Sequence, residues 1–286
     1  MLSMVREFGL TLDRPRTPAG GAFRWDTALP AVGGGLVSRV RRWLGPAVGT
    51  PTVFHITHHK AGSQWVNRVL HALAYDRLVL PEAGDAQFFR KPLVPGKVYP
   101  TVYVTREQFE TATLPPNSRW FVVIRDLRDT LISGYFSIKH SHAMEEEADL
   151  QLRARLHDSS FEDGMLHLLD HWLPERAAVQ ESWANGPDDA LKYEDILARD
   201  EEILGRVLIG HCRLAITPER LKEVVLANRF EARAGRKRGE EDVKSHERKG
   251  VAGDWRNHFT DSFAKAFKAR YGELLVATGY EKNGRW

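Results

Sequence analysis

The stretch PTVFHITHHKAGSQW, residues 51–65, decides the fold. Its first seven residues are mostly apolar and β-branched, which predicts a buried strand over 51–57. The residues that follow it, 65–73, predict a helix with one apolar stripe, made of Val66, Val69, Leu70 and Leu73. A strand, a turn of small residues and a helix together make an anion site, because free amides at the helix start and the adjacent Lys60 attract a phosphate or sulfate.

The turn of this unit lacks the signature of an ATP-binding Walker loop. Its glycine spacing differs from that of the Walker loop, and the residue directly after Lys60 is Ala61 rather than Ser or Thr. The turn therefore indicates phosphate binding without the ATPase signature. An ordinary strand-to-helix connection that needs Gly62 for its backbone angles remains the alternative at this point.

The composition is that of an ordinary globular chain. Its 286 residues are 42% hydrophobic and 28% charged, which fits one large α/β domain. A net charge of +3 gives no indication of nucleic-acid binding and fits a local basic site for an anionic small molecule. The single cysteine, Cys212, excludes an internal disulfide and favours a reducing compartment. With no transmembrane-length apolar run and no signal peptide, we expect a soluble, cytoplasmic protein.

Residues 1–50 are expected to form an N-terminal extension ahead of a domain over 51–286. The extension is rich in glycine, notably at 19–22 and 33–35, and has little reason to be ordered alone. Within it, residues 36–44 predict a short basic amphipathic helix. Docking of its apolar face on the domain is favoured over contact with a membrane surface, because its three arginines are weak evidence for a lipid partner.

Hydrophobic patterning after this extension predicts strands that alternate with helices. Further strands are expected over 77–80, 98–104, 119–124 and 189–193. Helices are expected over 106–111, 161–183 with a break at Pro174, 196–209, 218–230 and 259–271. This alternation implies an α/β fold whose sheet is parallel and whose ligand lies at the carboxyl edge of the strands.

Two polar stretches fall between these elements. Residues 140–160 predict an exposed loop, and residues 231–247 predict a charged segment that is mobile without ligand. Basic residues gather at Lys60, at Arg125 with Arg128, and at Arg248 with Lys249, and each cluster follows a strand end or a flexible run. If these clusters converge, they supply more positive charge than a ligand with a single carboxylate needs, so we expect a polyanionic ligand.

At these clusters the sequence resembles the cytosolic type of sulfotransferase over about residues 51–275. That family transfers a sulfuryl group from 3′-phosphoadenosine 5′-phosphosulfate (PAPS) to an acceptor hydroxyl or amine. The resemblance implies a three-layer fold like that of P-loop-containing nucleotide kinases, PAPS as co-substrate, and no metal. It implies a small-molecule, glycan or lipid acceptor, preferably an alcohol, and no nucleic acid; the acceptor itself has no readable sequence code.

The first signature of the family, roughly P-K-S-G-T-T-W, resembles residues 59–65. The resemblance places Lys60 on the 5′-phosphosulfate and Trp65 against the adenine. Gly62 is kept, while Ser63 and Gln64 stand where the family has threonines. Both replacements can still donate a hydrogen bond to an anionic oxygen.

Two further signatures extend the resemblance. Arg125 at a strand end, with Ser133 eight residues later, resembles the pair that holds the 3′-phosphate; a surface salt bridge between Arg125 and Asp129 is the alternative interpretation. The motif R-K-G-x-x-G-D-W is intact over 248–255. By resemblance the remaining nucleotide-binding residues are Arg248, Lys249, Gly250, Tyr193, and Phe230 with Asn228.

The sequence departs from the family at the general base. The cytosolic enzymes carry a histidine just after the strand that here ends near Val104, but the local residues are TREQ, 105–108. Glu107 is one candidate, and Asp85, which resembles the acidic residue of heparan-type sulfotransferases, is the other. A carboxylate serves if burial raises its pKa. The other polar side chains near the predicted cleft are histidines, which we expect to act as positioning residues: His58, His59, His140 and His142.

Two other functions remain open beside sulfuryl transfer. A P-loop-like kinase or nucleotide hydrolase is disfavoured by the missing Walker spacing and by Ala61 after the lysine. A catalytically silent nucleotide-binding relative is suggested by the absent histidine. Binding of adenosine 3′,5′-bisphosphate without magnesium, followed by an assay of sulfate transfer, separates the three.

Overall fold

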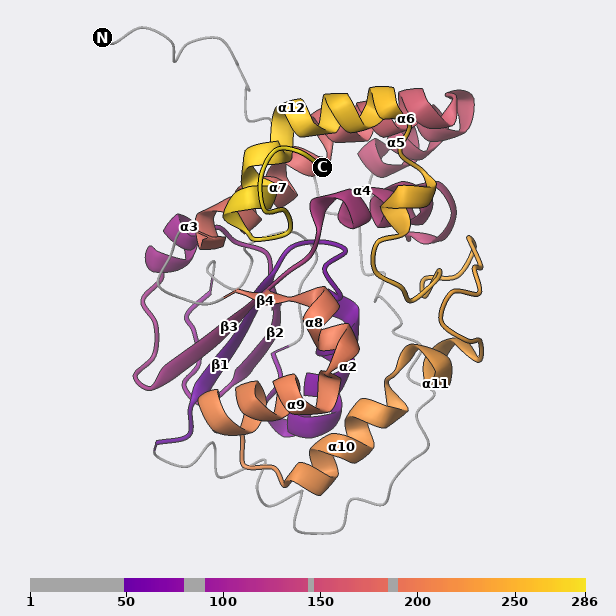
Figure 1. The fold of residues 1–286 in the computed structure, drawn as a ribbon. Coiled ribbons are helices and arrows are strands. Elements are labelled where there is room, and N and C mark those ends of the chain that lie inside the picture. The colour runs from indigo at the N-terminus through magenta and orange to yellow at the C-terminus, as the bar shows by residue number, and fades with distance from the viewer. Residues whose placement is uncertain (1–48, 80–90, 144–146, 185–189) are drawn as a thin grey trace, which may run out of the picture. The chain divides into compact units, whose positions relative to one another are not determined.

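The computed structural model describes residues 49–79, 91–143, 147–184 and 190–286 (Figure 1). This part of the chain contains a parallel sheet in the order β2-β1-β3-β4. Strand β1 pairs with β2 on one side and with β3 on the other, so that Phe54 lies opposite Tyr99 of β2 and Trp120 of β3. The strands are β1 Thr52–Thr57, β2 Val98–Val102, β3 Ser118–Ile124 and β4 Leu191–Lys192.

The strand order reverses beside β1. The chain passes from β1 to β2 on one side and then returns to β3 on the other side of β1. The loops that leave β1 and β3 therefore diverge, and open parallel sheets bind their ligands in the crevice at such a point. The order alone places the site after Thr57 and Ile124, where Lys60 and Arg125 follow.

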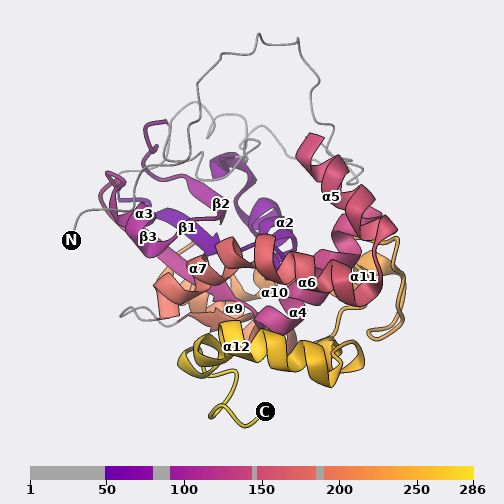
Figure 2. The same cartoon turned by 90° about the horizontal axis from the view of Figure 1, so that it is seen from above.

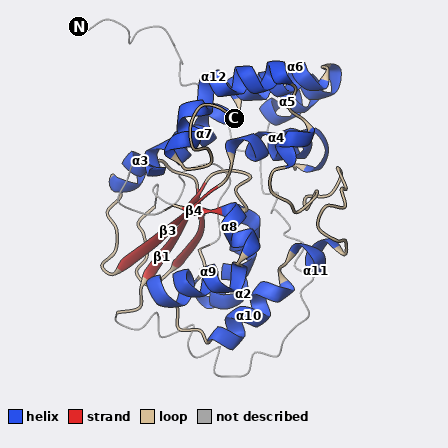
Figure 3. Cartoon of the chain, viewed as in Figure 1, coloured by secondary structure: helices blue, strands red, loops and turns tan. Residues whose placement is uncertain are grey.

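Helices cover both faces of the sheet, as Figure 3 shows by colour. Alternate residues of a strand point to opposite faces. Val53 and Val123 therefore pack with α2 (Ser63–Ala74), α9 (Asp200–Leu204) and α10 (Pro218–Ala227). Their neighbours Phe54 and Val122 pack on the other face against α3 (Arg106–Glu110) and α7 (Leu173–Ala184). The expected three-layer α/β fold is confirmed.

A second hydrophobic core lies among helices that follow the carboxyl end of β3 (Figures 1 and 2). Its first helix, α4, starts directly after that strand and is buried along most of its length. Because α4 is surrounded by other helices, polar groups at its start are held away from water. The helices are α4 Leu127–Phe136, α5 Glu147–Asp158, α6 Phe161–His171 and α12 Asp261–Ala277.

Shorter elements connect these layers. The segment η3, residues Ser137–Ser141, continues α4 as a π-helical turn, and such turns occur frequently at functional sites. Helix α8 starts at Tyr193, directly after β4. The bounds are η1 Tyr75–Arg77, η3 Ser137–Ser141, α8 Tyr193–Ala198, η4 Gly205–His211, α11 Phe230–Ala234 and η5 Asp254–Asn257.

Several boundaries differ from those expected from the sequence. The strand expected over 77–80 is only a bridge between Leu78 and Val98 after a 3₁₀ turn. The loop expected over 140–160 contains α5, which is anchored by the buried Leu156. The break expected at Pro174 within residues 161–183 is present: α6 ends at His171, and α7 begins at Leu173 with Pro174 in its first turn, where its missing N–H is not needed.

The remaining comparisons concern expected helices. The helix expected over 196–209 is divided into the end of α8, α9 and η4. Helix α3 begins as expected, with a capping box between Thr105 and Gln108. The helix expected over 36–44 lies outside the described residues. No helix of the described ranges is long and apolar enough to cross a membrane.

Candidate active site

The turn after β1 has an unusual backbone. Lys60 and Gly62 both adopt left-handed angles, with φ of 68° and 81°. Gly62 is required here for a second reason, because a Cβ on it would lie 2.6 Å from the ring of Tyr193. A lysine with positive φ is uncommon, and such strain is typical of binding sites. The turn thus brings the amides at the start of α2 and the Lys60 side chain to the carboxyl edge of the sheet.

Lys60 is held both at its side chain and at its backbone. Its Nζ donates to Ser137 Oγ at 2.9 Å, and its carbonyl accepts a hydrogen bond from Arg125 Nη1 at 2.9 Å. Burial, together with the nearby Arg125, lowers the pKa of Lys60 to about 8. An anion bound beside this ammonium group would favour its charged form.

Arg125 connects β3 to the same site. Its guanidinium lies over the ring of Tyr193, 4.7 Å from the centroid, and 4.0 Å from the Asp129 carboxylate. The salt bridge considered as an alternative is therefore present, but it is buried rather than on the surface. It leaves Arg125 on the wall of the cavity described below.

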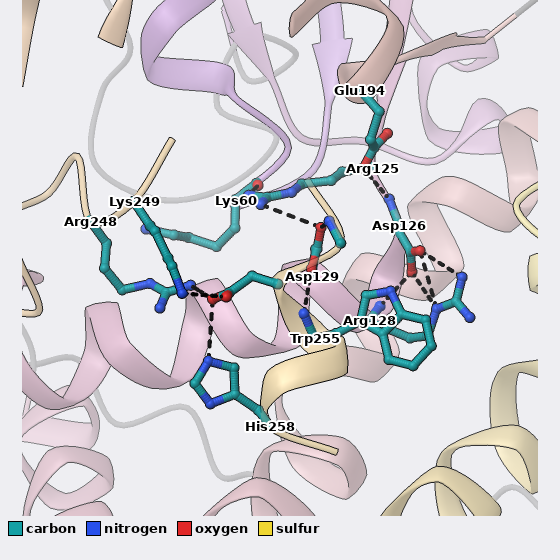
Figure 4. A network of polar contacts seen from close by, with 12 residues as sticks. Lys60, Arg125, Asp126, Arg128, Asp129, Glu194, Arg248, Lys249, Trp255 and His258 are labelled. Atoms are coloured by element: carbon teal, nitrogen blue, oxygen red, sulfur yellow. Dashed lines mark hydrogen bonds and ion pairs between the residues drawn. The ribbon is translucent and has the colours of Figure 1, made fainter. Parts of the chain in front are cut away.

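Asp129 attaches the R-K-G-x-x-G-D-W segment to α4. Its carboxylate accepts hydrogen bonds from the amides of Gly253 at 2.6 Å and Trp255 at 2.9 Å. Arg128, one residue earlier, lies over the Trp255 ring at 4.0 Å. Backbone and ring of the segment are thus both fixed by consecutive residues of one helix (Figure 4).

Asp254 holds the cations of the same segment. Its carboxylate, almost fully buried, accepts hydrogen bonds from Arg248 at 2.5 Å and Lys249 at 2.6 Å. Burial opposes the charge on Asp254, but the hydrogen bonds from Lys249, Asn257 and Arg248 outweigh it and hold its pKa well below the usual range. Arg248 and Lys249 are therefore positioned before any ligand arrives.

One cavity of about 200 Å³ brings these groups together. Its wall includes every residue that the three signatures and the weaker matches assigned to the nucleotide. These residues are Lys60, Gly62, Ser63, Gln64, Trp65, Arg125, Ser133, Tyr193, Asn228, Phe230, Arg248, Lys249 and Gly250. Residues far apart in the sequence thus meet at the switch point of the sheet.

Aromatic side chains form another part of this wall. The rings of Trp65 and Tyr193 meet edge to face with centroids 6.2 Å apart. Gly250, with φ of 67°, lies so close to Phe230 that a Cβ would be 2.5 Å from its ring. Such apolar surfaces beside a cluster of cations suit a flat base attached to phosphate groups.

The two carboxylates expected as general base are not brought into this cavity. Glu107 is exposed on α3 and is not among the described residues that line the cavity. Hydrogen bonds from its own amide and from Thr105 lower its pKa, the opposite of what a base needs. Asp85 lies outside the described residues. The geometry therefore does not support Glu107 as base.

The expected positioning histidines separate into two groups. His59 and His142 line the cavity, whereas His58 is buried and contacts Gln180 at 3.1 Å. His140 is not among the described lining residues and contacts the rings of Phe136 and His157.

Several lining residues escaped the analysis of the sequence. Tyr103 directly follows β2, stacks on His59 with centroids 4.0 Å apart, and donates to Ser63 Oγ at 2.9 Å. Its place after a strand end was the available signal. Arg68 pairs with Glu247 at 3.1 Å, one helical turn beyond Gln64. His246 also lines the wall, directly before that glutamate.

Fold and site define an α/β protein with a basic, partly aromatic cavity at the carboxyl edge of a parallel sheet. The chain belongs to the sulfotransferase family, because the model of the sulfotransferase domain matches residues 50–279. It is accordingly a sulfotransferase.

Individual sulfotransferases and related structures are similar to this chain at low sequence identity. The chain is 23% identical to a 3-alpha-hydroxysteroid sulfotransferase of Cavia porcellus over 251 residues, 77% of this chain and 82% of that protein. Mouse sulfotransferase SULT7A1 in complex with PAP has a TM-score of 0.57 at 17% identity, covering 82% and 90% of the two chains. Retinol dehydratase in complex with androsterone and PAP has a TM-score of 0.52 at 15% identity, covering 82% and 83%.

Proposed function

We propose that this sulfotransferase takes its sulfuryl group from PAPS and transfers it to a hydroxyl of a small-molecule acceptor, with adenosine 3′,5′-bisphosphate as the second product. The observation that carries the proposal is the meeting of all the expected nucleotide residues on the wall of one cavity. The cations on this wall match a doubly phosphorylated nucleotide, and among them are Lys60, Arg125, Arg248 and Lys249.

Lys60 is assigned to the migrating group. During in-line transfer, negative charge builds on the oxygen that bridges sulfur and phosphorus, and a cation fixed beside that oxygen lowers the barrier. The left-handed turn holds Lys60 next to the amides of α2, which suit the 5′-phosphosulfate. Ser137 accepts a hydrogen bond from the ammonium group and can keep it in place until the nucleotide arrives.

The 3′-phosphate is assigned to Arg125, Ser133 and Arg248. Buried Asp129 and Asp254 orient the two arginines, so little reorganisation accompanies binding. The adenine is assigned to the aromatic wall, in reach of Trp65 and Phe230.

The acceptor class is supported by the relatives. One relative is named for a 3-alpha-hydroxysteroid, and one similar structure contains androsterone. An alcohol on an apolar skeleton is therefore the first acceptor class to test, with amines second. Glycans and lipid headgroups follow.

Two measurements test the proposal. Calorimetry without magnesium should show tight binding of adenosine 3′,5′-bisphosphate and much weaker binding of adenosine 5′-monophosphate. Incubation with sulfate-labelled PAPS should then label androsterone, retinol or 4-nitrophenol. If the nucleotide does not bind, the proposal is wrong; binding without transfer to any of these acceptors indicates a silent nucleotide-binding relative instead.

A further inference from the structure

Transfer to an alcohol needs a group that accepts the hydroxyl proton, and the geometry does not support Glu107 in that role. A general base must lie within hydrogen-bond reach of the acceptor, so it belongs on the wall of the cavity that holds Lys60. Among the described lining residues, the His, Tyr and Glu side chains, which can accept a proton, are His59, Tyr103, His142, Tyr193, His246 and Glu247.

The contacts of several of these side chains argue against the role of base. The ring of Tyr193 faces the Arg125 guanidinium, 4.7 Å from the centroid. Glu247 pairs with Arg68, and the Tyr103 hydroxyl donates to Ser63. Nδ1 of His59 faces the guanidinium of Arg176 at 3.4 Å. Because a guanidinium only donates, this nitrogen accepts, and the proton of the neutral ring resides on Nε2. With Nδ1 facing Arg176 and Nε2 carrying the proton, His59 is disfavoured as the base.

We propose that His142 is the general base of the transfer, a role that rests on the proposed function. His142 follows the π-helical turn Ser137–Ser141, and its amide donates to the Ser137 carbonyl at 2.7 Å. The side chain of the same Ser137 accepts the hydrogen bond from Lys60. One turn of chain thus positions both the cation for the leaving group and the histidine for the acceptor.

The backbone of His142 is fixed from a second element. Arg153 of α5 donates to its carbonyl at 2.5 Å and to the carbonyl of Ile138 at 2.7 Å. The helix that replaces the expected loop therefore holds the end of the π-helical turn. This gives α5 a positioning function that its exposed, polar sequence did not indicate.

The groups that face His142 come from several elements. They include His59 after β1 and His246 before Arg248, which both interact electrostatically with His142, and Arg153 on α5, which donates to its carbonyl. Burial, and after it the charge of Arg176, lowers the pKa of His59 to about 3. His59 thus stays neutral at physiological pH and does not oppose the positive charge that His142 takes up.

In the proposed step one bond to sulfur forms and one breaks. The acceptor oxygen forms a bond to sulfur while the bond from sulfur to the bridging phosphate oxygen breaks. Adenosine 3′,5′-bisphosphate leaves with that electron pair beside Lys60. The hydroxyl proton passes to the imidazole of His142, which releases it to solvent before the next turnover.

The test compares His142→Ala with the matched control His140→Ala. His140 lies on the same turn but is not among the described residues of the cavity wall. With sulfate-labelled PAPS, His142→Ala should lose about 100-fold in transfer to androsterone, the lower range for a general base. Transfer to 4-nitrophenol, which ionises without help near neutral pH, should change much less, and added imidazole should restore the alcohol reaction. His140→Ala should behave like the wild type in each assay.

The outcomes separate the two proposals. A wild type that labels neither acceptor contradicts sulfuryl transfer itself. A wild type that labels androsterone, with His142→Ala equally active, contradicts only the base. Equal losses with both acceptors also contradict it, because a structural defect does not depend on acceptor acidity. Loss of the alcohol reaction in His246→Ala or Asp85→Asn, with His142→Ala intact, assigns the base to those residues instead.

Discussion

The side of the cavity proposed for the nucleotide (the nucleotide side) and the side proposed for the acceptor (the acceptor side) are held together in different ways. On the nucleotide side, Arg125 and Arg248 are each paired with a buried carboxylate, Asp129 and Asp254. On the acceptor side, His59 and Tyr103 stack as neutral rings. The first side is an ionic network built on one helix and one loop, whereas the second contains stacked rings from separate segments.

This difference explains why one side carries a recognisable motif. A buried charge without a partner is costly, so both partners of each pair must stay at fixed positions. Neutral rings have no such requirement, since a ring contributed by another segment can take the same place. The nucleotide side can therefore be recognised from a sequence motif, whereas the acceptor side cannot.

The largest expected effect comes from breaking the ionic network at its centre. Asp254→Ala leaves Arg248 and Lys249 without the carboxylate that holds both. Removing one partner of a buried pair costs about 3–5 kcal/mol, so the free energy of unfolding should fall by that order. Urea unfolding measures it, and the affinity for adenosine 3′,5′-bisphosphate should fall as well.

The pH dependence of stability offers a control for this variant. The pKa of Asp254 is depressed in the folded state, so its contribution is complete above its unfolded pKa, about 3.9, and is lost as the pH falls below that value. Wild type should therefore lose stability in acid to a greater extent than Asp254→Ala. Parallel curves for the two proteins would contradict the assignment of this ion cluster.

The next largest effect is on catalysis more than on binding. Lys60→Ala should lower sulfate transfer by at least about two orders of magnitude, because the cation beside the leaving oxygen is lost. Binding of adenosine 3′,5′-bisphosphate, which lacks the sulfuryl group, should weaken less. Lys60→Arg keeps the charge and should retain part of the activity. Equal losses in binding and turnover would mean that Lys60 serves binding only.

The sequence predicted well which residues come together on the side of the cavity proposed for the nucleotide. Lys60, Arg125 and Arg248 follow strand ends or a fixed motif, and the strand order brings them to one edge. It could not predict the partners: that Asp129 receives the amides of Gly253 and Trp255 depends on how α4 packs beneath that segment. Local patterns contain no information on such long-range contacts.

The acceptor side was predicted far less well, for a related reason. Residues 140–160 are polar and contain no strong apolar stripe, so the sequence indicated a loop where α5 forms. Tertiary contacts decide here: Leu156 is buried, and Arg153 satisfies backbone carbonyls of the preceding turn. With α5 missing from the expected structure, His142 had no fixed place, and Glu107 remained a candidate because it follows the right strand.

A smaller effect should distinguish groups within the nucleotide side. Arg125→Ala and Ser133→Ala should each weaken adenosine 3′,5′-bisphosphate, by about 1.5–3 kcal/mol for a charge-assisted hydrogen bond. Adenosine 5′-monophosphate lacks the 3′-phosphate and should lose little affinity. Calorimetry with both ligands measures the contrast. Equal losses of affinity for the two ligands would mean that Arg125 and Ser133 do not contact the 3′-phosphate.

The smallest expected effect is that of Glu107→Gln, which sharpens the boundary of the acceptor side. Glu107 is exposed on α3, outside the described lining residues, and the substitution leaves the capping box of Thr105 and Gln108 intact. Turnover with androsterone should therefore stay within about twofold of wild type at every pH, a change below about 0.5 kcal/mol as for other surface substitutions. If Glu107→Gln instead removes the acidic limb of the pH profile while nucleotide affinity is unchanged, the start of α3 belongs to the acceptor side. A carboxylate would then do what the sequence first suggested, and His142 would be left with a positioning function.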